Sequence, residues 1–162
     1  MISNDIIKNN KKIRQVALSY LAKSEYTRFT LREKLLRKGF LHQVVEAALD
    51  SLAQQGFLDD ARFCEVFIAR RVRQGYGPIR ILAECRQYGI NEEIITSQLQ
   101  QDEEFWLTVI NAVWQKKKFS ADNSSQQEQL RQIRYLQYRG FRLDQIKESQ
   151  KNYLSNKTAL IK

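Results

Sequence analysis

The chain has 162 residues, of which 43% are hydrophobic, with six glycines and one proline. This length permits one globular domain or a short array of small units with a real core. So few glycines and prolines favour helices over a sandwich of β-strands. No run of about 18 apolar residues occurs, which argues against a membrane span, and residues 1–12 lack the apolar region of a secretory signal. We therefore expect a cytoplasmic protein that does not associate with membranes.

The formal net charge is +9, because 27 Lys and Arg residues outnumber 18 Asp and Glu residues. The excess lies toward the ends: residues 1–57 carry ten basic and five acidic groups, residues 58–101 carry six of each, and residues 102–162 carry eleven and seven. A basic chain favours a polyanionic partner, most often nucleic acid. The alternative is a charged surface that only keeps the protein soluble.

Three segments of the chain align on a glycine and indicate an internal repeat. Gly39, Gly89 and Gly140 are separated by 50 and 51 residues. The residues four positions before and one position after each glycine are Leu35 and Phe40, Cys85 and Ile90, and Leu136 and Phe141. A helix that ends in a Schellman motif shows this pattern, with glycine just past its end and an apolar contact across the turn. We therefore predict three equivalent helices that end at these glycines.

The apolar spacing and the capping signals predict nine helices. In chain order they cover residues 13–24, 29–38 and 42–55; 59–74, 78–88 and 91–100; and 103–118, 125–139 and 143–153. Thr30 with Glu33, and Ser125 with Glu128, are typical of capping boxes. The Gly75-Tyr76-Gly77-Pro78 sequence predicts a turn, with Pro78 at the first position of the next helix.

The predicted fold class is therefore all-α, with three tandem three-helix repeats that form an elongated, curved array. Residues 1–57 hold an N-terminal tail and the first repeat, residues 58–101 the second, and residues 102–162 the third. Because so small a unit buries little surface alone, neighbouring repeats are expected to share a core. The polar composition predicts a flexible loop at 120–127 and a C-terminal tail that frays from residue 156. Such an array needs no second copy, so we expect a monomer.

Residues that could carry catalysis are few and have no evident partners. His42 is the one histidine, and no Ser or Cys partner is indicated for it. Asp59 and Asp60 could bind a metal, but the helix dipole alone accounts for acidic side chains at a helix start. Cys64 and Cys85 fit buried thiols. We expect no catalytic residue, no metal site and no cofactor, and therefore no enzyme; a hydrolase or nuclease built on the acidic residues is the weaker alternative.

Basic side chains are better candidates for a binding site. In the first repeat three of them share a helix face at spacings of three and four, and in the third repeat arginines alternate with tyrosines. Arginine beside aromatic rings suits phosphate contact and base stacking, whereas the alternative is solvated surface charge. The candidate binding residues are Lys34, Arg37, Lys38, Arg70, Arg71, Arg73, Arg80, Arg131, Arg134 and Arg139. A further run, Lys116 to Lys118, ends a predicted helix, where dipole complementation can account for it.

Several stretches resemble the bacterial RecX family of regulatory proteins. They are 17–21 (ALSYL), 31–39 (LREKLLRKG), 56–67 (GFLDDARFCEVF), 75–89 (GYGPIRILAECRQYG) and 138–146 (YRGFRLDQI). The Leu-Asp-Asp-x-Arg-Phe and Gly-x-Gly-Pro-x-Arg-Ile segments are the most specific, and Cys85 departs from the leucine that the family often has. The resemblance implies tandem three-helix repeats and no enzymatic activity. It also implies binding to the RecA recombinase, especially to its filament on single-stranded DNA, along whose groove such a protein would lie.

The implied function is inhibition: RecX-like proteins limit the strand exchange, the ATP hydrolysis and the SOS co-protease activity of RecA. Direct binding to DNA is a further expectation from the charge. A competing interpretation is a helix-turn-helix-like DNA-binding regulator. Against it, the predicted third helix at 42–55 is apolar and nearly uncharged, whereas a recognition helix presents Arg, Asn, Gln or Ser to base edges.

Overall fold

All regular secondary structure in the described part of the chain is helical, as the sequence predicts. The computed structural model describes the backbone of residues 2–117 and 126–160, and the side chains within 10–117 and 126–152. The helices are α1 (Ile2–Leu21), α2 (Arg28–Arg37), α3 (His42–Gln54), α4 (Asp60–Arg73), α5 (Pro78–Gln87), α6 (Glu92–Leu99), α7 (Glu103–Lys117), α8 (Gln126–Tyr138) and α9 (Leu143–Leu160). The predicted helices therefore match the observed ones closely except at the two ends.

The helices at the two ends of the chain are longer than predicted. Helix α1 begins at Ile2 instead of residue 13, and α9 continues to Leu160 beyond the predicted fraying point. Neither segment contains glycine or proline, so nothing terminates the helix even where the apolar pattern fades. Of the predicted loop at 120–127, residues 120–125 lie outside the described part, and the last two already belong to α8.

The chain forms two compact units, the first made of residues 1–66 with 85–94 and the second of residues 67–84 with 95–162. Helices α4, α5 and α6 contribute residues to both units. We describe each unit by itself, so the elongated, curved array and the repeat boundaries of the sequence analysis stay predictions.

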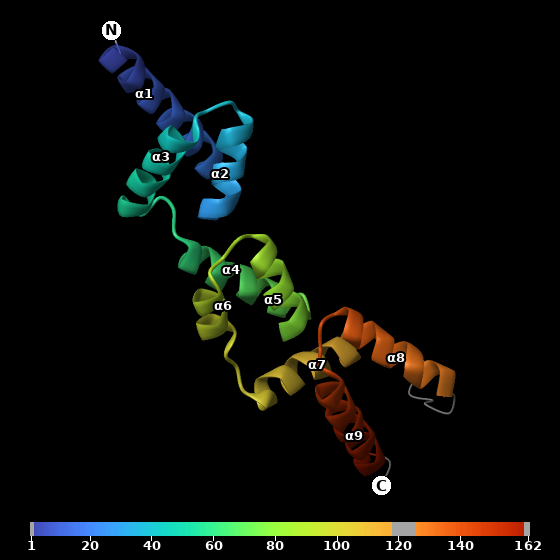
Figure 1. Ribbon diagram of the computed structural model, residues 1–162. Helices are drawn as coiled ribbons and strands as arrows, with labels where there is room; N and C mark the ends of the chain where they lie inside the picture. Colours follow the sequence, from blue (N-terminus) through green and yellow to red (C-terminus); the bar gives the residue numbers. More distant parts are fainter. Residues whose placement is uncertain (1, 118–125, 161–162) are drawn as a thin grey trace. The chain divides into compact units, whose positions relative to one another are not determined.

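In the first unit, α1, α2 and α3 pack around one apolar core (Figure 1). The buried residues of this core are Ile13, Ala17, Leu31, Leu35, Val45, Leu49, Leu52 and Leu58. Those within the three helices are spaced by three or four residues, which places them on one face of each helix. The apolar face of the third helix, which the sequence shows at 42–55, is thus used for packing.

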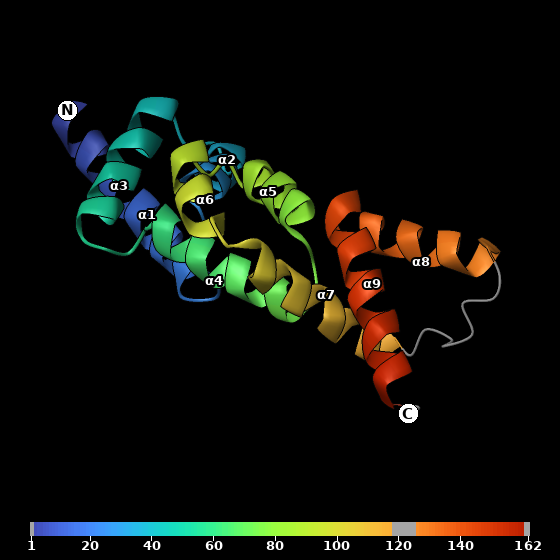
Figure 2. The same ribbon diagram turned by 90° about the horizontal axis from the view of Figure 1, so that it is seen from below.

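In the second unit, α9 packs beside both α7 and α8 (Figure 2). The buried apolar residues of these helices and of the α8–α9 turn are Trp106, Ile110, Val113, Trp114, Leu136, Phe141 and Ile146. Gln132, which takes the place of Leu31 and Ile81 in the other repeats, is fully buried as well. This position is therefore buried in all three repeats, although the third repeat has a polar side chain there.

The three predicted Schellman turns are present. Gly39, Gly89 and Gly140 have φ angles of 88°, 68° and 91°. In each turn the amide after the glycine donates to the carbonyl of the predicted partner, so that Phe40 N reaches Leu35 O at 3.4 Å, Ile90 N reaches Cys85 O at 3.4 Å and Phe141 N reaches Leu136 O at 3.2 Å. These bonds satisfy carbonyls that the helix end leaves without partners. The glycine pattern therefore marks the same turn in all three repeats.

The predicted capping box of α2 is placed three residues too late. Thr27, not Thr30, is the N-cap: its side chain accepts from the Thr30 amide, and the Thr30 hydroxyl accepts from the Thr27 amide. A threonine at the third helical position can thus take the role that the usual box gives to Glu or Gln. The other predicted box begins at Ser125, which lies outside the described residues.

Thr27 also fixes the end of α5 in the first unit. Its hydroxyl donates to the Tyr88 carbonyl at 2.6 Å, and the Phe29 side chain covers the Gly89 turn so closely that a Cβ on Gly89 would lie 2.4 Å from Phe29 Cβ. The first turn of α2 therefore packs against the glycine turn that ends α5. We call this contact the first junction.

Both cysteines are buried free thiols, as predicted. Burial raises the pKa of Cys64, which disfavours the thiolate. Among the described residues, no three His, Cys, Asp or Glu side chains are grouped to hold a metal ion. Within the same residues, none of the helices has the length and apolar character needed to cross a membrane.

Glu46 of α3 links α3 to α2 through two arginines. Arg32 Nε lies 2.5 Å and Arg28 Nη2 2.7 Å from its carboxylate. The hydrogen bond from Arg32, supported by that from Arg28, outweighs partial burial and lowers the pKa of Glu46 from 4.5 to about 2. Since the folded state holds the charged carboxylate more strongly than the unfolded chain, this stabilisation is present above about pH 4.5 and is lost as the pH falls toward 2.

We expect Glu46→Gln to lower the free energy of unfolding by about 2 kcal/mol at pH 7, because both arginines lose a charged acceptor. The difference from the unsubstituted protein should shrink as the pH falls from 4.5 toward 2. Urea unfolding followed by circular dichroism at several pH values measures it. Glu65→Gln, at an exposed position of the same unit, is the control and should change little. A pH-independent difference would refute this account of Glu46.

Candidate functional site

Two glycines shape the turn between α4 and α5. Gly75 has a φ of 77°, and the amides of Gly75 and Tyr76 donate to the carbonyls of Val72 and Arg71 at 2.8 and 3.1 Å. Helix α4 therefore ends in the same kind of Schellman turn as α2. Pro78 begins α5, as the sequence predicts, so that the turn directs the chain at once into the next helix.

This turn rests on the turn between α8 and α9. Gly77 N donates to the Arg139 carbonyl at 2.8 Å, and Ile79 N donates to the Gly140 carbonyl at 3.0 Å. A Cβ on Gly77 would lie 2.5 Å from the carbonyl carbon and oxygen of Gly140, which is closer than any side chain can approach. We call this contact the second junction, and it explains why the motif requires glycine at this position.

Three arginines surround the ring of Tyr76 in this turn. The guanidinium carbons of Arg80, Arg139 and Arg71 lie 4.5, 5.1 and 5.2 Å from its centroid. Glu84 lies 2.7 Å from Arg71 Nε and 3.0 Å from Arg80 Nε. We call these five residues the Tyr76 cluster. Its three guanidinium groups and one carboxylate leave an excess of two positive charges. Cation–π contacts with the Tyr76 ring stabilise these guanidinium groups in partly buried positions.

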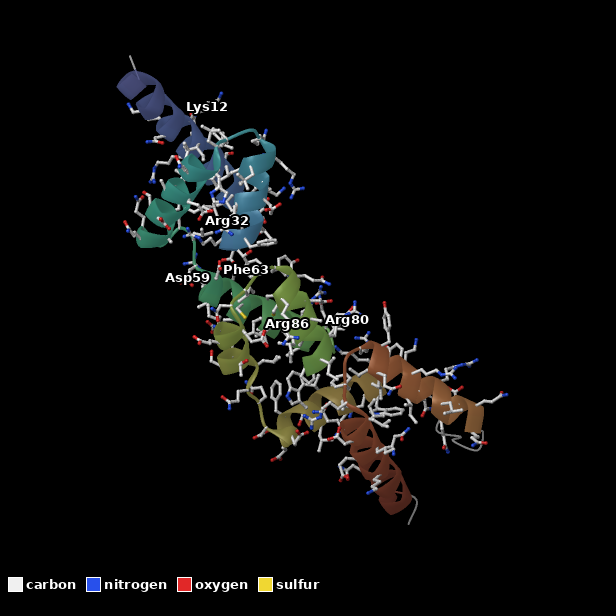
Figure 3. All side chains as sticks on the ribbon, in the orientation of Figure 1. Lys12, Arg32, Asp59, Phe63, Arg80 and Arg86 are labelled. Carbon is white, nitrogen blue, oxygen red and sulfur yellow. The ribbon has the colours of Figure 1, made fainter. Side chains whose placement is uncertain are left out.

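Arg80 and Arg139 also hold the second junction together. Arg80 Nη1 donates to the Tyr138 carbonyl at 3.3 Å and its guanidinium lies 4.9 Å from the Tyr138 ring; Figure 3 labels Arg80 at the side of α5. The hydrogen bond to Glu84, followed by that to the Tyr138 side chain, raises the pKa of Arg80. Arg139 Nη1 donates to the carbonyls of Gln74 and Gly75 at 2.8 and 3.0 Å. Two of the predicted binding residues therefore carry structural contacts as well.

A pocket of about 310 Å³ lies beside Arg139, and we call it the Tyr135 pocket. Its apolar surface comes from Val72, Val109, Ala112 and Val113, and its cationic rim from Arg73, Lys116, Lys117 and Arg139. Lys117 Nζ and the Arg139 guanidinium lie 5.2 and 5.0 Å from the Tyr135 ring centroid. None of the described residues that line the pocket is acidic. The pocket can therefore take an anionic group that is attached to an apolar one.

Of the ten predicted binding residues, the structure brings four together around the Tyr76 cluster and the Tyr135 pocket. These four are Arg71, Arg73, Arg80 and Arg139. Arg70 lies on the same helix as Arg71 with its guanidinium 5.4 Å from the Phe67 ring centroid. Arg71, Arg73 and Arg80 of the second repeat and Arg139, which follows α8, thus form one surface of the second unit, although they are about 60 residues apart in sequence.

The other predicted residues do not join this surface. In the first unit, Lys34 lies 5.3 and 5.5 Å from the ring centroids of Tyr20 and Tyr26, while Arg37 and Lys38 are exposed. In the second unit, Arg131 is 80% exposed and lies 3.3 Å from Glu128. With Arg134 it lines a separate depression on α8. The predicted pairing of arginine with tyrosine along α8 holds for Arg139.

Sequence reasoning passed over four residues that complete the surface. It assigns Tyr76 only to a turn, does not single out Glu84, and explains Lys116 and Lys117 by the helix dipole. The expected pairing of Tyr135 with Arg139 is present. The sequence signals were the Gly-x-Gly-Pro motif and the lysine run, but the contact between the α4–α5 and α8–α9 turns depends on tertiary packing.

Comparisons with known proteins agree with this architecture. Family models of the first, second and third three-helix domains of RecX match residues 14–52, 59–99 and 103–148. A regulatory protein RecX from Halorhodospira halophila is 39% identical over 85% of this chain and 86% of its own length. One from Legionella pneumophila is 38% identical over 85% of this chain and 95% of its own length. The crystal structure of RecX from Lactobacillus salivarius shares the fold, with a TM-score of 0.81, 19% identity, and coverage of 92% of this chain and 98% of that one.

Proposed function

The chain belongs to the RecX family, and we propose that it inhibits the RecA recombinase by binding the RecA filament on single-stranded DNA. Binding would limit strand exchange, ATP hydrolysis and the SOS co-protease activity of the filament. The protein would act as a monomer in the cytoplasm, without catalysis of its own. Its relatives are named regulatory proteins, which agrees with a regulatory role and goes no further.

The observation that supports a filament partner best is the cationic surface of the second unit. The Tyr76 cluster and the Tyr135 pocket together present Arg71, Arg73, Arg80, Lys116, Lys117 and Arg139, against the single carboxylate of Glu84. A nucleoprotein filament is a polyanion, and such a surface attracts it over long range. Direct binding to phosphates adds a contribution that weakens with salt.

The direct test is ATP hydrolysis by RecA on single-stranded DNA, measured while this protein is added. We expect turnover to fall to a low plateau at saturation, because a ligand that binds along the filament restrains the subunits that hydrolyse ATP. The protein alone, with DNA and Mg²⁺, should hydrolyse no ATP and cut no DNA. Unchanged turnover at a concentration where filament binding is saturated would disprove the inhibition.

The competing function, a helix-turn-helix-like DNA-binding regulator, is separated by footprinting on duplex fragments. Helix α3 buries Val45, Leu49 and Leu52, so its apolar face is occupied by the core. We expect no discrete protected site at moderate salt. A discrete site would favour sequence recognition over filament binding.

A further inference from the structure

The glycine turn that ends α2 is the uncovered counterpart of two turns that are covered within the chain. In both junctions the first turn of one helix, α2 or α5, packs against the glycine turn that ends another. A Cβ on Gly89 would lie 2.4 Å from Phe29 Cβ, and a Cβ on Gly140 would lie 2.4 Å from both the backbone nitrogen and Cβ of Arg80. Around Gly39, by contrast, a Cβ would meet no described atom within 4 Å. The same turn is therefore used twice and left open once.

The two junctions agree in register and in hydrogen bonding. The N-cap residue of α2 is Thr27 and that of α5 is Gly77. Each lies twelve positions before the glycine of its own repeat, Gly39 or Gly89. In each case it donates to the carbonyl of the residue just before the receiving glycine: Thr27 Oγ1 to Tyr88 at 2.6 Å and Gly77 N to Arg139 at 2.8 Å. The equivalent acceptor in the first repeat is the carbonyl of Lys38.

The residues beside Gly39 show the same lack of cover. Ile90 and Phe141, which follow the two receiving glycines, are 5% and 1% exposed. Their counterpart Phe40 is only half-buried, and the next residue, Leu41, is 70% exposed. Terminal repeats of helical arrays normally present a polar outer face. Apolar side chains at this position therefore point to a surface that is covered in a complex.

We infer that the turn at Lys38–Leu41 binds the first turn of a helix from a protein partner. The two junctions define what fits. The partner's helix carries glycine or a hydroxyl residue at its N-cap and a bulky apolar residue two positions later, as in Thr27-Arg28-Phe29 and Gly77-Pro78-Ile79. Exposed Arg37 and Lys38 beside the turn oppose the positive end of a helix dipole, so Asp or Glu in the partner's first turn would strengthen the contact; α5 packs beside Arg139 without an acidic residue in its first turn.

A second copy of this chain is a poor occupant. The corresponding position in the third repeat, twelve residues before Gly140, is Glu128, which lies inside α8 instead of at its N-cap. The N-caps that do fit, Thr27 and Gly77, are already engaged in the two junctions. The inference therefore takes its partner from the proposed function: a subunit of the recombinase filament supplies the helix.

The test exploits an unused cap position. Leu41 is the N-cap of α3, and its side chain makes no capping hydrogen bond. Leu41→Asp supplies a capping side chain, so the variant should fold with an unchanged or slightly higher melting temperature. It also removes the apolar contact that Leu41 offers and puts a charged, hydrated side chain in its place. We expect it to weaken binding to RecA filaments on single-stranded DNA about tenfold or more, measured by anisotropy of the labelled protein.

Asn91→Asp is the matched control. Asn91 holds the same register in the second repeat, also caps its helix, and follows a glycine that Phe29 already covers, so filament affinity should change less than twofold. Equal affinity of Leu41→Asp and the unsubstituted protein would overturn the inference and leave the proposed function standing. No filament binding by the unsubstituted protein would instead overturn the proposed function, together with the partner assigned to this turn.

A photocrosslinking residue at position 41 gives a second readout. With purified filaments it should form a crosslink to a peptide at the start of a RecA helix, and the same residue at position 91 should not. Crosslinks only between copies of this chain, or only to DNA, would contradict a protein helix as the occupant.

Discussion

Gly140→Ala is expected to lower the free energy of unfolding by about 3 kcal/mol. Two costs combine. The residue has a φ of 91°, where an L side chain costs about 1 kcal/mol, and the new methyl group would lie 2.4 Å from the backbone nitrogen of Arg80. A backbone atom cannot move aside as the end of a side chain can, so the second junction must open.

Gly39→Ala is the matched control for this substitution. Its φ of 88° is nearly the same, but a Cβ there meets no described atom within 4 Å. It should therefore cost only about 1 kcal/mol. Urea unfolding by circular dichroism compares the two variants, and fluorescence of Trp106 and Trp114, both buried in the second unit, reports the junction's own unit. Equal losses in the two variants would mean that the second junction contributes nothing to stability.

Neutralising two cations of the Tyr135 pocket should have the largest effect on binding to nucleic acid. We expect the double variant Arg73→Gln and Lys116→Gln to bind a labelled oligo-dT about ten to a hundred times more weakly at low salt. The slope of log affinity against log salt should fall by about 1.4, because two phosphate contacts on a single strand are lost. Fluorescence anisotropy between 50 and 200 mM salt measures both quantities.

The control for this pair is Lys11→Gln with Lys12→Gln. These lysines are exposed in the first unit, so the substitution removes the same two charges from the net +9 without touching the pocket. It should leave most of the affinity and the slope in place. If the two double variants lose affinity equally, net charge alone attracts DNA and the pocket has no special part in binding.

Local chemistry explains which parts of the fold were predictable. The Schellman turns at Gly39, Gly89 and Gly140 depend on residues within six positions of one another, so the sequence shows them directly. Pro78 at the start of α5 is equally local. The ends of the chain were harder to predict, because the apolar pattern that marks a helix fades in residues 2–12 and 156–160, which contain neither the glycine nor the proline that ends a helix.

The candidate site was predictable only in part because its geometry is not local. The sequence places Arg71 and Arg80 near each other, but Arg139 reaches Tyr76 only through the contact between two turns. The same contact brings Tyr135 and Arg139 against Arg73 at the pocket. Charge counting also treats all arginines alike, so it could not separate Arg80, held by Glu84 and the Tyr138 carbonyl, from exposed Arg131.

The recurrence of one junction geometry at two places has a consequence for how such chains can change length. The first and second repeats each carry a helix start and a glycine turn of this kind within about fifty residues, whereas the third repeat carries only the glycine turn. Duplication or deletion of the second repeat would therefore still bring a helix start against a glycine turn of the right shape at the new boundary. Chains of this type can therefore grow or shrink by complete segments without evolving a new interface.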